Sequence, residues 1–241
     1  MSSPVFRSFC AAVIGGALLA SLCAPAVAQS RRHLVYDFTV GISNDSSNTS
    51  SFLESGGGAT SGRDSYNATT SDKGQIAVDI MGMQTDGGLM VSVSETAKSR
   101  NEKATTCAVY ATTNVVCSDA NTNPEIISVL RTLSPKFFNG ANLDAKRHWR
   151  VADTNAGIQI DFNVTPNSDG TLGITSQRDQ TFKGAQPGSI HSTASYVYDP
   201  AKYMPTSLKE YTIVREETGP GSYSNITVDL TASLAGDSLK G

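Results

Sequence analysis

Two cysteines, Cys107 and Cys117, are the residues in the body of the chain best suited to chemistry, and they flank the segment AVYATTNVV. Paired thiols can bind a metal, cycle between redox states or form a disulfide. A zinc site needs further ligands at regular spacing, but the sequence has no C-x-x-C and no H-x-x-x-H. If Tyr110 pairs with Asn114 in a hairpin, the register brings the two cysteines opposite each other. We therefore predict a structural disulfide, Cys107–Cys117.

Histidines and catalytic motifs give weaker signals. The only histidines are His33, His148 and His191, and their spacing does not force them together. We expect ordinary surface or partly buried histidines in place of a metal site. No G-x-S-x-G or S-x-x-K motif has the strand–turn–helix context of a hydrolase, and the carboxylates are scattered. The sequence predicts no catalytic residue, no metal and no cofactor, and hence a protein that is not an enzyme.

One dense basic segment, residues 146–150 (KRHWR), allows two interpretations. In a strand, Arg147 and Trp149 share one face, while Lys146, His148 and Arg150 share the other. This could form an anion contact beside an aromatic platform. It could equally be a core tryptophan beside a solvated basic face, which is the interpretation we favour. No ligand-binding residue can be named from this pattern.

The N-terminus has the order of a secretory signal peptide. Arg7 precedes an apolar run over residues 9–24, and Ala26-Val27-Ala28 supplies a cleavage motif. We predict a signal peptide over residues 1–28, cleavage before Gln29, and a single β-rich domain over residues 29–241. An uncleaved membrane anchor and a lipoprotein acylated at Cys23 are the alternatives, although the leucine before Cys23 fits lipidation poorly.

Export determines what the remaining composition means. The mature chain keeps two cysteines, and an even count in the oxidising periplasm or extracellular space is typical of a disulfide. Without Arg7 the chain carries 18 basic and 22 acidic residues, which argues against nucleic acid or an anionic membrane surface as partner. No later segment reaches 18 uninterrupted apolar residues, so no stable helical span is expected after signal removal. The oligomeric state stays open.

The mature chain reads as a succession of strands. Segments 34–42 (LVYDFTVGI), 75–83 (QIAVDIMGM) and 157–165 (GIQIDFNVT) place apolar residues at every second position. Short turns separate about ten or eleven such runs. This predicts a mainly β fold, a single-domain antiparallel meander that forms a curved sheet or incomplete barrel. We expect a mobile Ser/Gly-rich loop near residues 43–62 and a turn at residues 71–74.

One helix is expected in mid-chain, over residues 124–134. Asn123 is a good N-cap, Pro124 suits the first helical position and Glu125 favours the positive end of the dipole. The apolar stripe that should pack on the concave face of the sheet consists of Ile126, Ile127, Leu130 and Leu133.

Export, a long antiparallel meander and a covering apolar helix together resemble the periplasmic lipid and lipoprotein carriers of the LolA/LppX type. The resemblance implies that acyl chains bind between a concave sheet and its helix, with an apolar small molecule or lipid as partner. It rests on layout, so no binding residue is carried over. The alternative is a structural or interaction protein of the cell envelope with a filled core. An outer-membrane barrel is also compatible with the alternation, but 7% aromatic residues and a mid-chain helix argue against it.

Overall fold

The computed structural model describes residues 32–53, 59–99, 101–134, 147–183, 187–219 and 222–239. The chain divides into two compact units, Met1–Ser30 and Arg31–Gly241, and the second contains all of the described structure. The predicted signal peptide and its cleavage position lie outside the described residues. Within these ranges, no helix is long and apolar enough to cross a membrane.

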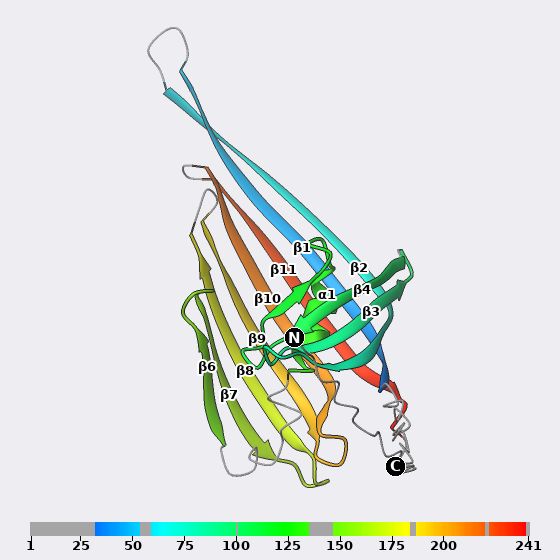
Figure 1. Cartoon of the computed structure of the whole chain (residues 1–241). Coiled ribbons are helices and arrows are strands. Elements are labelled where there is room, and N and C mark those ends of the chain that lie inside the picture. Colours follow the sequence, from blue (N-terminus) through cyan, green and yellow to red (C-terminus); the bar gives the residue numbers. More distant parts are fainter. Residues whose placement is uncertain are drawn as a thin grey trace, which may run out of the picture. The chain divides into compact units, whose positions relative to one another are not determined.

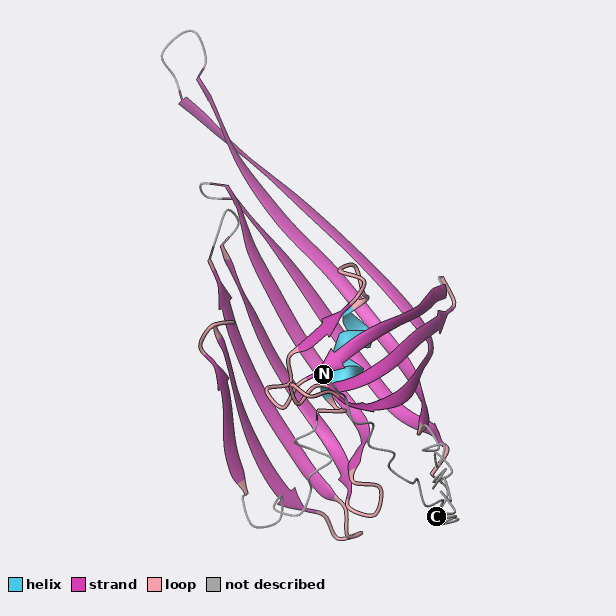
Figure 2. Cartoon of the chain, viewed as in Figure 1, coloured by secondary structure: helices cyan, strands magenta, loops and turns pink. Residues whose placement is uncertain are grey.

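Strands dominate the second unit (Figures 1 and 2). They are β1 (His33–Leu53), β2 (Ala59–Met83), β3 (Leu89–Ala97), β4 (Asn101–Val109), β5 (Val115–Cys117), β6 (His148–Asp153), β7 (Ile158–Pro166), β8 (Leu172–Phe182), β9 (Gly188–Asp199), β10 (Met204–Gly219) and β11 (Ser222–Asp237). The helix α1 (Pro124–Arg131) lies between β5 and β6 in sequence.

All of these strands belong to one antiparallel sheet. The 11-stranded sheet has the order β5-β4-β3-β2-β1-β11-β10-β9-β8-β7-β6. Neighbouring strands are consecutive in sequence except β1 and β11, which pair in the middle of the sheet. The sheet is curved. Its edge strands, β5 and β6, do not pair with each other, so it stays open. The predicted fold class, an antiparallel meander with one mid-chain helix, is confirmed.

Period-two alternation builds the core. Along β1, Leu34, Tyr36, Phe38 and Val40 are buried, while Asp37 and Thr39 between them are exposed. The same alternation buries inward residues of the other strands: Ile76, Val78, Val91, Val93, Ile158, Ile160, Phe162 and Val164. Ile80, the next inward position of segment 75–83, is only half-buried. These side chains line the concave face, which is the face that α1 contacts (Figure 2). A strand buried on one face has its register fixed, because a slip of one residue would expose the whole apolar set.

The helix α1 packs into this concave face. Ile126, Leu130 and Leu133 are fully buried, as predicted, whereas Ile127 is only half-buried. The helix ends at Arg131, three residues before the predicted end. Leu133 lies in the turn that follows, and its N–H donates to the Leu130 carbonyl at 2.9 Å. The predicted apolar stripe is therefore correct in its main members.

Asn123 is the N-cap residue of α1, as predicted, but it does not cap the helix with its side chain. The Asn123 side chain makes no capping hydrogen bond, although its carbonyl accepts from the Ile127 N–H at 3.2 Å. Its Nδ2 instead donates to Oε2 of Glu95 on β3 at 3.0 Å. Glu95 is 1% exposed, and a buried carboxyl group without a hydrogen-bond donor would be unfavourable. Asn123 thus ties the helix to the sheet.

The predicted loop near residues 43–62 is also wrong. Residues 43–53 and 59–62 belong to β1 and β2, and their pairing continues from Leu34↔Val78 to Leu53↔Ala59. Ladder hydrogen bonds use only the backbone, so a Ser- and Asn-rich segment can extend a register set by apolar residues further along. The predicted mobility falls partly on residues 54–58, which lie outside the described residues.

The turn predicted at residues 71–74 is a continuous part of β2. Gly74 pairs with Ala97 at the end of β3. A Cβ at position 74 would collide with the Thr96 carbonyl, so the glycine serves close strand approach and not chain reversal.

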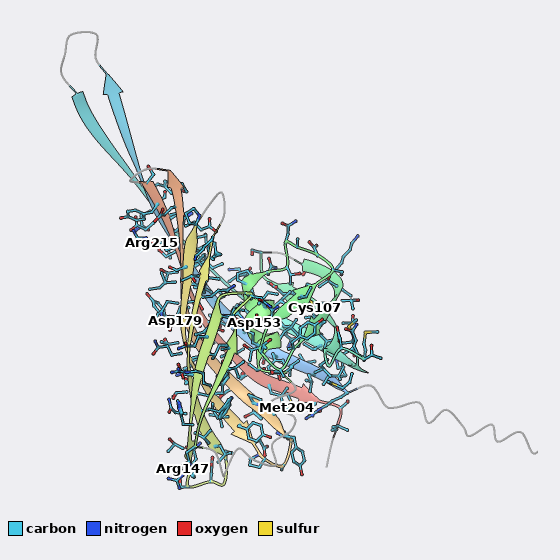
Figure 3. The ribbon with its side chains drawn as sticks, turned by 60° about the vertical axis from the view of Figure 1, so that its left-hand side comes forward. Cys107, Arg147, Asp153, Asp179, Met204 and Arg215 are labelled. Carbon is cyan, nitrogen blue, oxygen red and sulfur yellow. A yellow bond between two sulfur atoms is a disulfide. The ribbon has the colours of Figure 1, made fainter. Side chains whose placement is uncertain are left out.

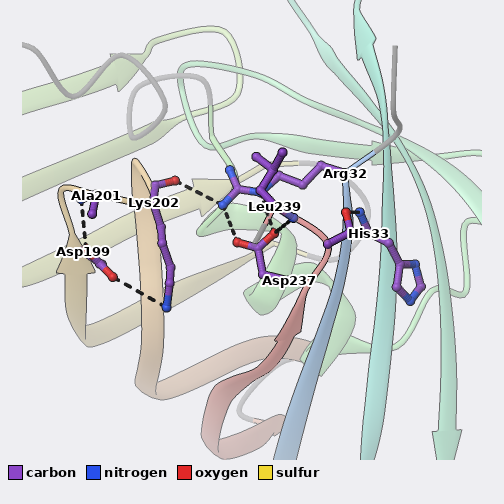
Figure 4. A network of polar contacts seen from close by, with 8 residues as sticks. Arg32, His33, Asp199, Ala201, Lys202, Asp237 and Leu239 are labelled. Carbon is purple, nitrogen blue, oxygen red and sulfur yellow. Dashed lines mark hydrogen bonds and ion pairs between the residues drawn. The ribbon is translucent and has the colours of Figure 1, made fainter. Parts of the chain in front are cut away.

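A polar network joins the two ends of this unit (Figure 4). The Arg32 guanidinium donates from Nε to Oδ1 of Asp237 at 3.1 Å and from Nη2 to Oδ2 at 2.7 Å. Its Nη2 also donates to the Lys202 carbonyl at 3.1 Å, in the turn between β9 and β10. This bidentate pair fixes the start of β1 to the end of β11. These two strands, the first and last of the chain, pair with each other in the middle of the sheet.

Candidate functional site

The two cysteines form a disulfide, as predicted. They stand opposite each other in the β4–β5 hairpin, where the Tyr110 N–H donates to the Asn114 carbonyl at 2.9 Å. Thr113 in the turn has φ 61°. Cys107 is buried against the core, so this pair fastens a hairpin and presents no thiol for chemistry.

The three histidines do not converge. Each is an exposed ring that faces a carboxylate of an adjacent strand: His33 with Asp79 at 2.8 Å, His148 with Asp161 at 3.9 Å, and His191 with Asp179 at 2.7 Å. Asp179 is on the outer face of the sheet, turned away from α1 (Figure 3). No group of potential metal ligands exists in the part of the chain that the structure describes.

The basic segment follows the interpretation that we favoured. Trp149 is buried and stacks on Phe162 of β7, with ring centroids 4.6 Å apart and planes 9° apart. Arg150 points to the other face and donates from Nε to Oδ1 of Asp161 at 2.7 Å. His148 is exposed on that same face, and Lys146 lies outside the described residues. The tryptophan is part of the core and the basic side chains form a solvated surface.

A buried polar cluster on the concave face was not predicted from the sequence. It joins the end of α1 to three adjacent strands, β8, β9 and β10. Its members are Ser128, Arg131, Ser176, Arg178, Ser192, Glu210 and Thr212. The strand register explains the grouping, because Arg178 pairs with Ser192, and Ser192 pairs in turn with Thr212. Polar side chains thus occupy inward positions between apolar neighbours.

Glu210 is the acceptor at the centre of the cluster. Its Oε1 accepts from Arg131 Nη1 at 3.2 Å, from Ser192 Oγ at 2.7 Å and from Thr212 Oγ1 at 3.1 Å. Burial alone would raise the pKa of this carboxyl, but the Arg131 charge and the Ser192, Ser128 and Thr212 hydroxyls lower it overall. Glu210 is therefore ionised at neutral pH and neutralises one guanidinium.

Arg178 is the second positive charge. It is 6% exposed, and its Nη2 donates to Oε1 of Gln180 at 2.8 Å. Within the described ranges its Nε and Nη1 have no hydrogen-bond partner, and neither does Nε of Arg131. Burial, and then the Arg131 charge, lower the pKa of Arg178 to about 9, so it still carries its charge at neutral pH. Two guanidinium groups and one carboxylate leave this cluster with one excess positive charge.

The apolar surface continues past the cluster. The next inward positions after Ser192 on β9 and Thr212 on β10 are Ile190 and Val214, which pair with each other. Val214 also pairs with Ile226, an inward residue of β11. Ile42 of β1 lies beside them, paired with Val228. All four are half-buried, in contrast to the fully buried core next to α1. We call Ile42, Ile190, Val214 and Ile226 the half-buried strip.

Shallow depressions also occur on the outer face. One of about 480 Å³ is lined by Gln177, Thr193, Lys209, Tyr211 and Asp229, among others. Lys209 also lines two further depressions nearby. Their walls are mostly outward-facing polar residues; the first also includes Ser176 and Glu210, whose buried side chains belong to the polar cluster on the concave face. The concave face is therefore the better candidate for a binding site.

No family model and no curated protein matches this chain. Among solved structures, lipovitellin is similar with a TM-score of 0.41 and 10% identity over 86% of this chain and 26% of that chain. This chain thus spans about a quarter of the lipovitellin chain. An uncharacterized protein from Rhizobium leguminosarum gives a TM-score of 0.20 at 16% identity, over 38% of this chain and 55% of that one. The secretin domain of InvG from Salmonella gives 0.18 at 8% identity, over 88% and 64%. These likenesses are too distant to assign a function.

Proposed function

We propose that this protein is an exported, non-catalytic binding protein that takes up an apolar molecule against the concave face of its curved sheet. The observation that carries the proposal is the half-buried strip. Ile42 and Ile226 pack against the core, and all four side chains keep part of their surface accessible. A contiguous apolar surface that remains open to solvent favours occupation by an apolar partner.

The binding position lies beyond the helix and not beneath it. Ile126, Leu130 and Leu133 are fully buried, which leaves the space between α1 and the sheet occupied by side chains. Open or large curved sheets have room for a ligand where their own side chains do not fill the curve. Val214 and Ile226, paired on β10 and β11, would contact the ligand directly.

Two further arguments support the exported, carrier-like role. The N-terminal motif and the Cys107–Cys117 disulfide both fit an oxidising compartment. The layout resembles that of LolA/LppX-type carriers, in which acyl chains bind a concave sheet.

The filled space beneath α1 favours a second candidate. A structural or interaction protein of the cell envelope would need only a rigid, fully packed unit. The zero exposure of Leu130 is what such a protein requires.

Lipid extraction and native mass spectrometry of protein purified from its own host test the binding role. We expect a co-purifying apolar molecule, and we expect the purified protein to bind the neutral dye Nile red. Val214→Asp should abolish dye binding, because it places a charge in the half-buried strip. Val197→Asp is the matched control, since Val197 is exposed on the outer face of β9. If no molecule co-purifies and no dye binds, the envelope role replaces the carrier role.

A further inference from the structure

We propose that the apolar ligand is a single-chain fatty acid whose carboxylate binds Arg178 and Arg131. This inference rests on the proposed function and names the chemistry of its ligand. It starts from the excess positive charge of the buried polar cluster.

The charge inside the cluster is not balanced by the described residues. Oε1 of Glu210 already accepts from Arg131, Ser192 and Thr212. Arg178 uses one nitrogen on the neutral amide of Gln180, which supplies no negative charge. A buried guanidinium with unsatisfied N–H groups is unfavourable unless a negatively charged acceptor neutralises it.

The two arginines belong to the same cluster. Arg131 Nη1 donates to Oε1 of Glu210, and Ser192, which pairs with Arg178, donates to the same oxygen. Nε and Nη1 of Arg178 and Nε of Arg131 are the N–H groups without a partner among the described residues. An oxyanion that accepts from both side chains would satisfy these donors and separate two like charges. One added negative charge would bring the cluster to neutrality, which favours a carboxylate over a doubly charged phosphate.

The half-buried strip supplies the place for the chain. Gln180, the partner of Arg178, pairs with Ile190 at the start of the strip. From there the strip crosses four strands, from β9 to β1, a distance of roughly 14 Å at the usual strand spacing. On β9 and β10 it is one side chain wide, between Ser192 and Thr212 on one side and Gly188 and Glu216 on the other. A single extended acyl chain fits this width, whereas a two-chain lipid would need a broader surface.

Binding of a dansyl-labelled long-chain fatty acid and of its uncharged methyl ester tests the proposal. Both probes carry the same chain, so their difference in affinity reports the head group. We expect the acid to bind the natural protein at least about tenfold more tightly than the ester, the range that a hydrogen-bonded charge supplies. Arg178→Gln should remove this preference, with the larger loss of affinity for the acid. Arg178→Lys should keep part of the preference.

Controls separate the head-group inference from the proposed function. Arg150→Gln removes an exposed arginine on the outer face and should change neither affinity. Circular dichroism verifies that each variant folds. If acid and ester bind the natural protein equally, the head-group inference fails while the proposed function stands. If neither probe binds, both fail. If inorganic phosphate or chloride at low concentration displaces the acid without displacing the ester, the cluster is a general anion site and the fatty-acid assignment is overturned.

Discussion

Replacing Leu130 with alanine tests whether α1 seals a filled core. Leu130 is 0% exposed and packs between α1 and the concave face. The change deletes three carbon groups, which at about 0.8 kcal/mol each gives about 2.4 kcal/mol of lost transfer free energy. The cavity that remains adds to this, and measured Leu→Ala changes cost about 2–5 kcal/mol. We expect Leu130→Ala to lower the free energy of unfolding by about 3–4 kcal/mol.

Equilibrium unfolding in urea, with the disulfide intact, measures this loss. The chain has one tryptophan, Trp149, and its buried ring on Phe162 makes fluorescence a direct reporter of the folded state. Leu239→Ala is the matched control. Leu239 is 53% exposed, so its truncation should change stability by less than about 0.5 kcal/mol.

One result would refute the reasoning about the helix. A loss below about 1 kcal/mol with an unchanged denaturant slope would mean that the space beneath α1 tolerates the missing carbons. If Nile red binding also increased in Leu130→Ala, a ligand rather than side chains would normally occupy that space. The helix would then act as a lid, and the binding position would move from the half-buried strip to the space beneath α1.

Three further changes probe the rest of the unit. Asp237→Asn breaks the bidentate pair with Arg32 and should cost about 3 kcal/mol in urea unfolding. Although burial opposes it, Arg32 lowers the pKa of Asp237, so the natural protein should lose this stability as pH falls through the folded pKa, while the variant should not. Replacing Cys107 and Cys117 by serine should cost about 2.5–3 kcal/mol, and reductant should then have no further effect. Arg178→Met should raise the stability of the ligand-free protein by about 1–4 kcal/mol, because it removes an unbalanced buried charge; a loss of stability in the same unfolding assay would contradict this.

Local sequence patterns predict the features that depend on neighbours along the chain. Alternation in segments such as 34–42 and 157–165 predicts which side chains reach the core, because the strand repeat is two everywhere. The hairpin around Ala111 follows from its short turn, and its register determines that Cys107 faces Cys117. The predicted end of α1 is less accurate, because a turn can continue an apolar stripe beyond the last helical residue.

Features that depend on distant partners could not be predicted in the same way. Residues 43–53 are strand because residues 59–69 pair with them, and residues 223–227 pair with 43–47 on the other side; their polar sequence carries no periodic signal. The cluster depends on pairing among β8, β9 and β10, which places Ser192 between Arg178 and Thr212 in one row across the sheet. The sequence does contain a signal for the cluster. Arg178 stands an even number of residues from the buried Leu172 and Ile174, and Glu210 stands two residues from the buried Leu208, so both charged side chains fall on the inward face. Charged residues at inward positions of a strand are the observation to search for.

The distribution of polar groups argues for a division of tasks within one sheet. Near α1 and the β4–β5 hairpin, inward charges have partners, as Glu95 has in Asn123, and the space is filled. Across β8 to β11, Arg178 keeps unsatisfied nitrogens and the strip beside it stays half-buried. A unit built for rigidity alone would gain stability from an apolar residue at position 178. The buried charge of Arg178 lowers the stability of the ligand-free protein. An anion that binds there would neutralise the charge and so stabilise the bound protein, which explains why the residue is an arginine.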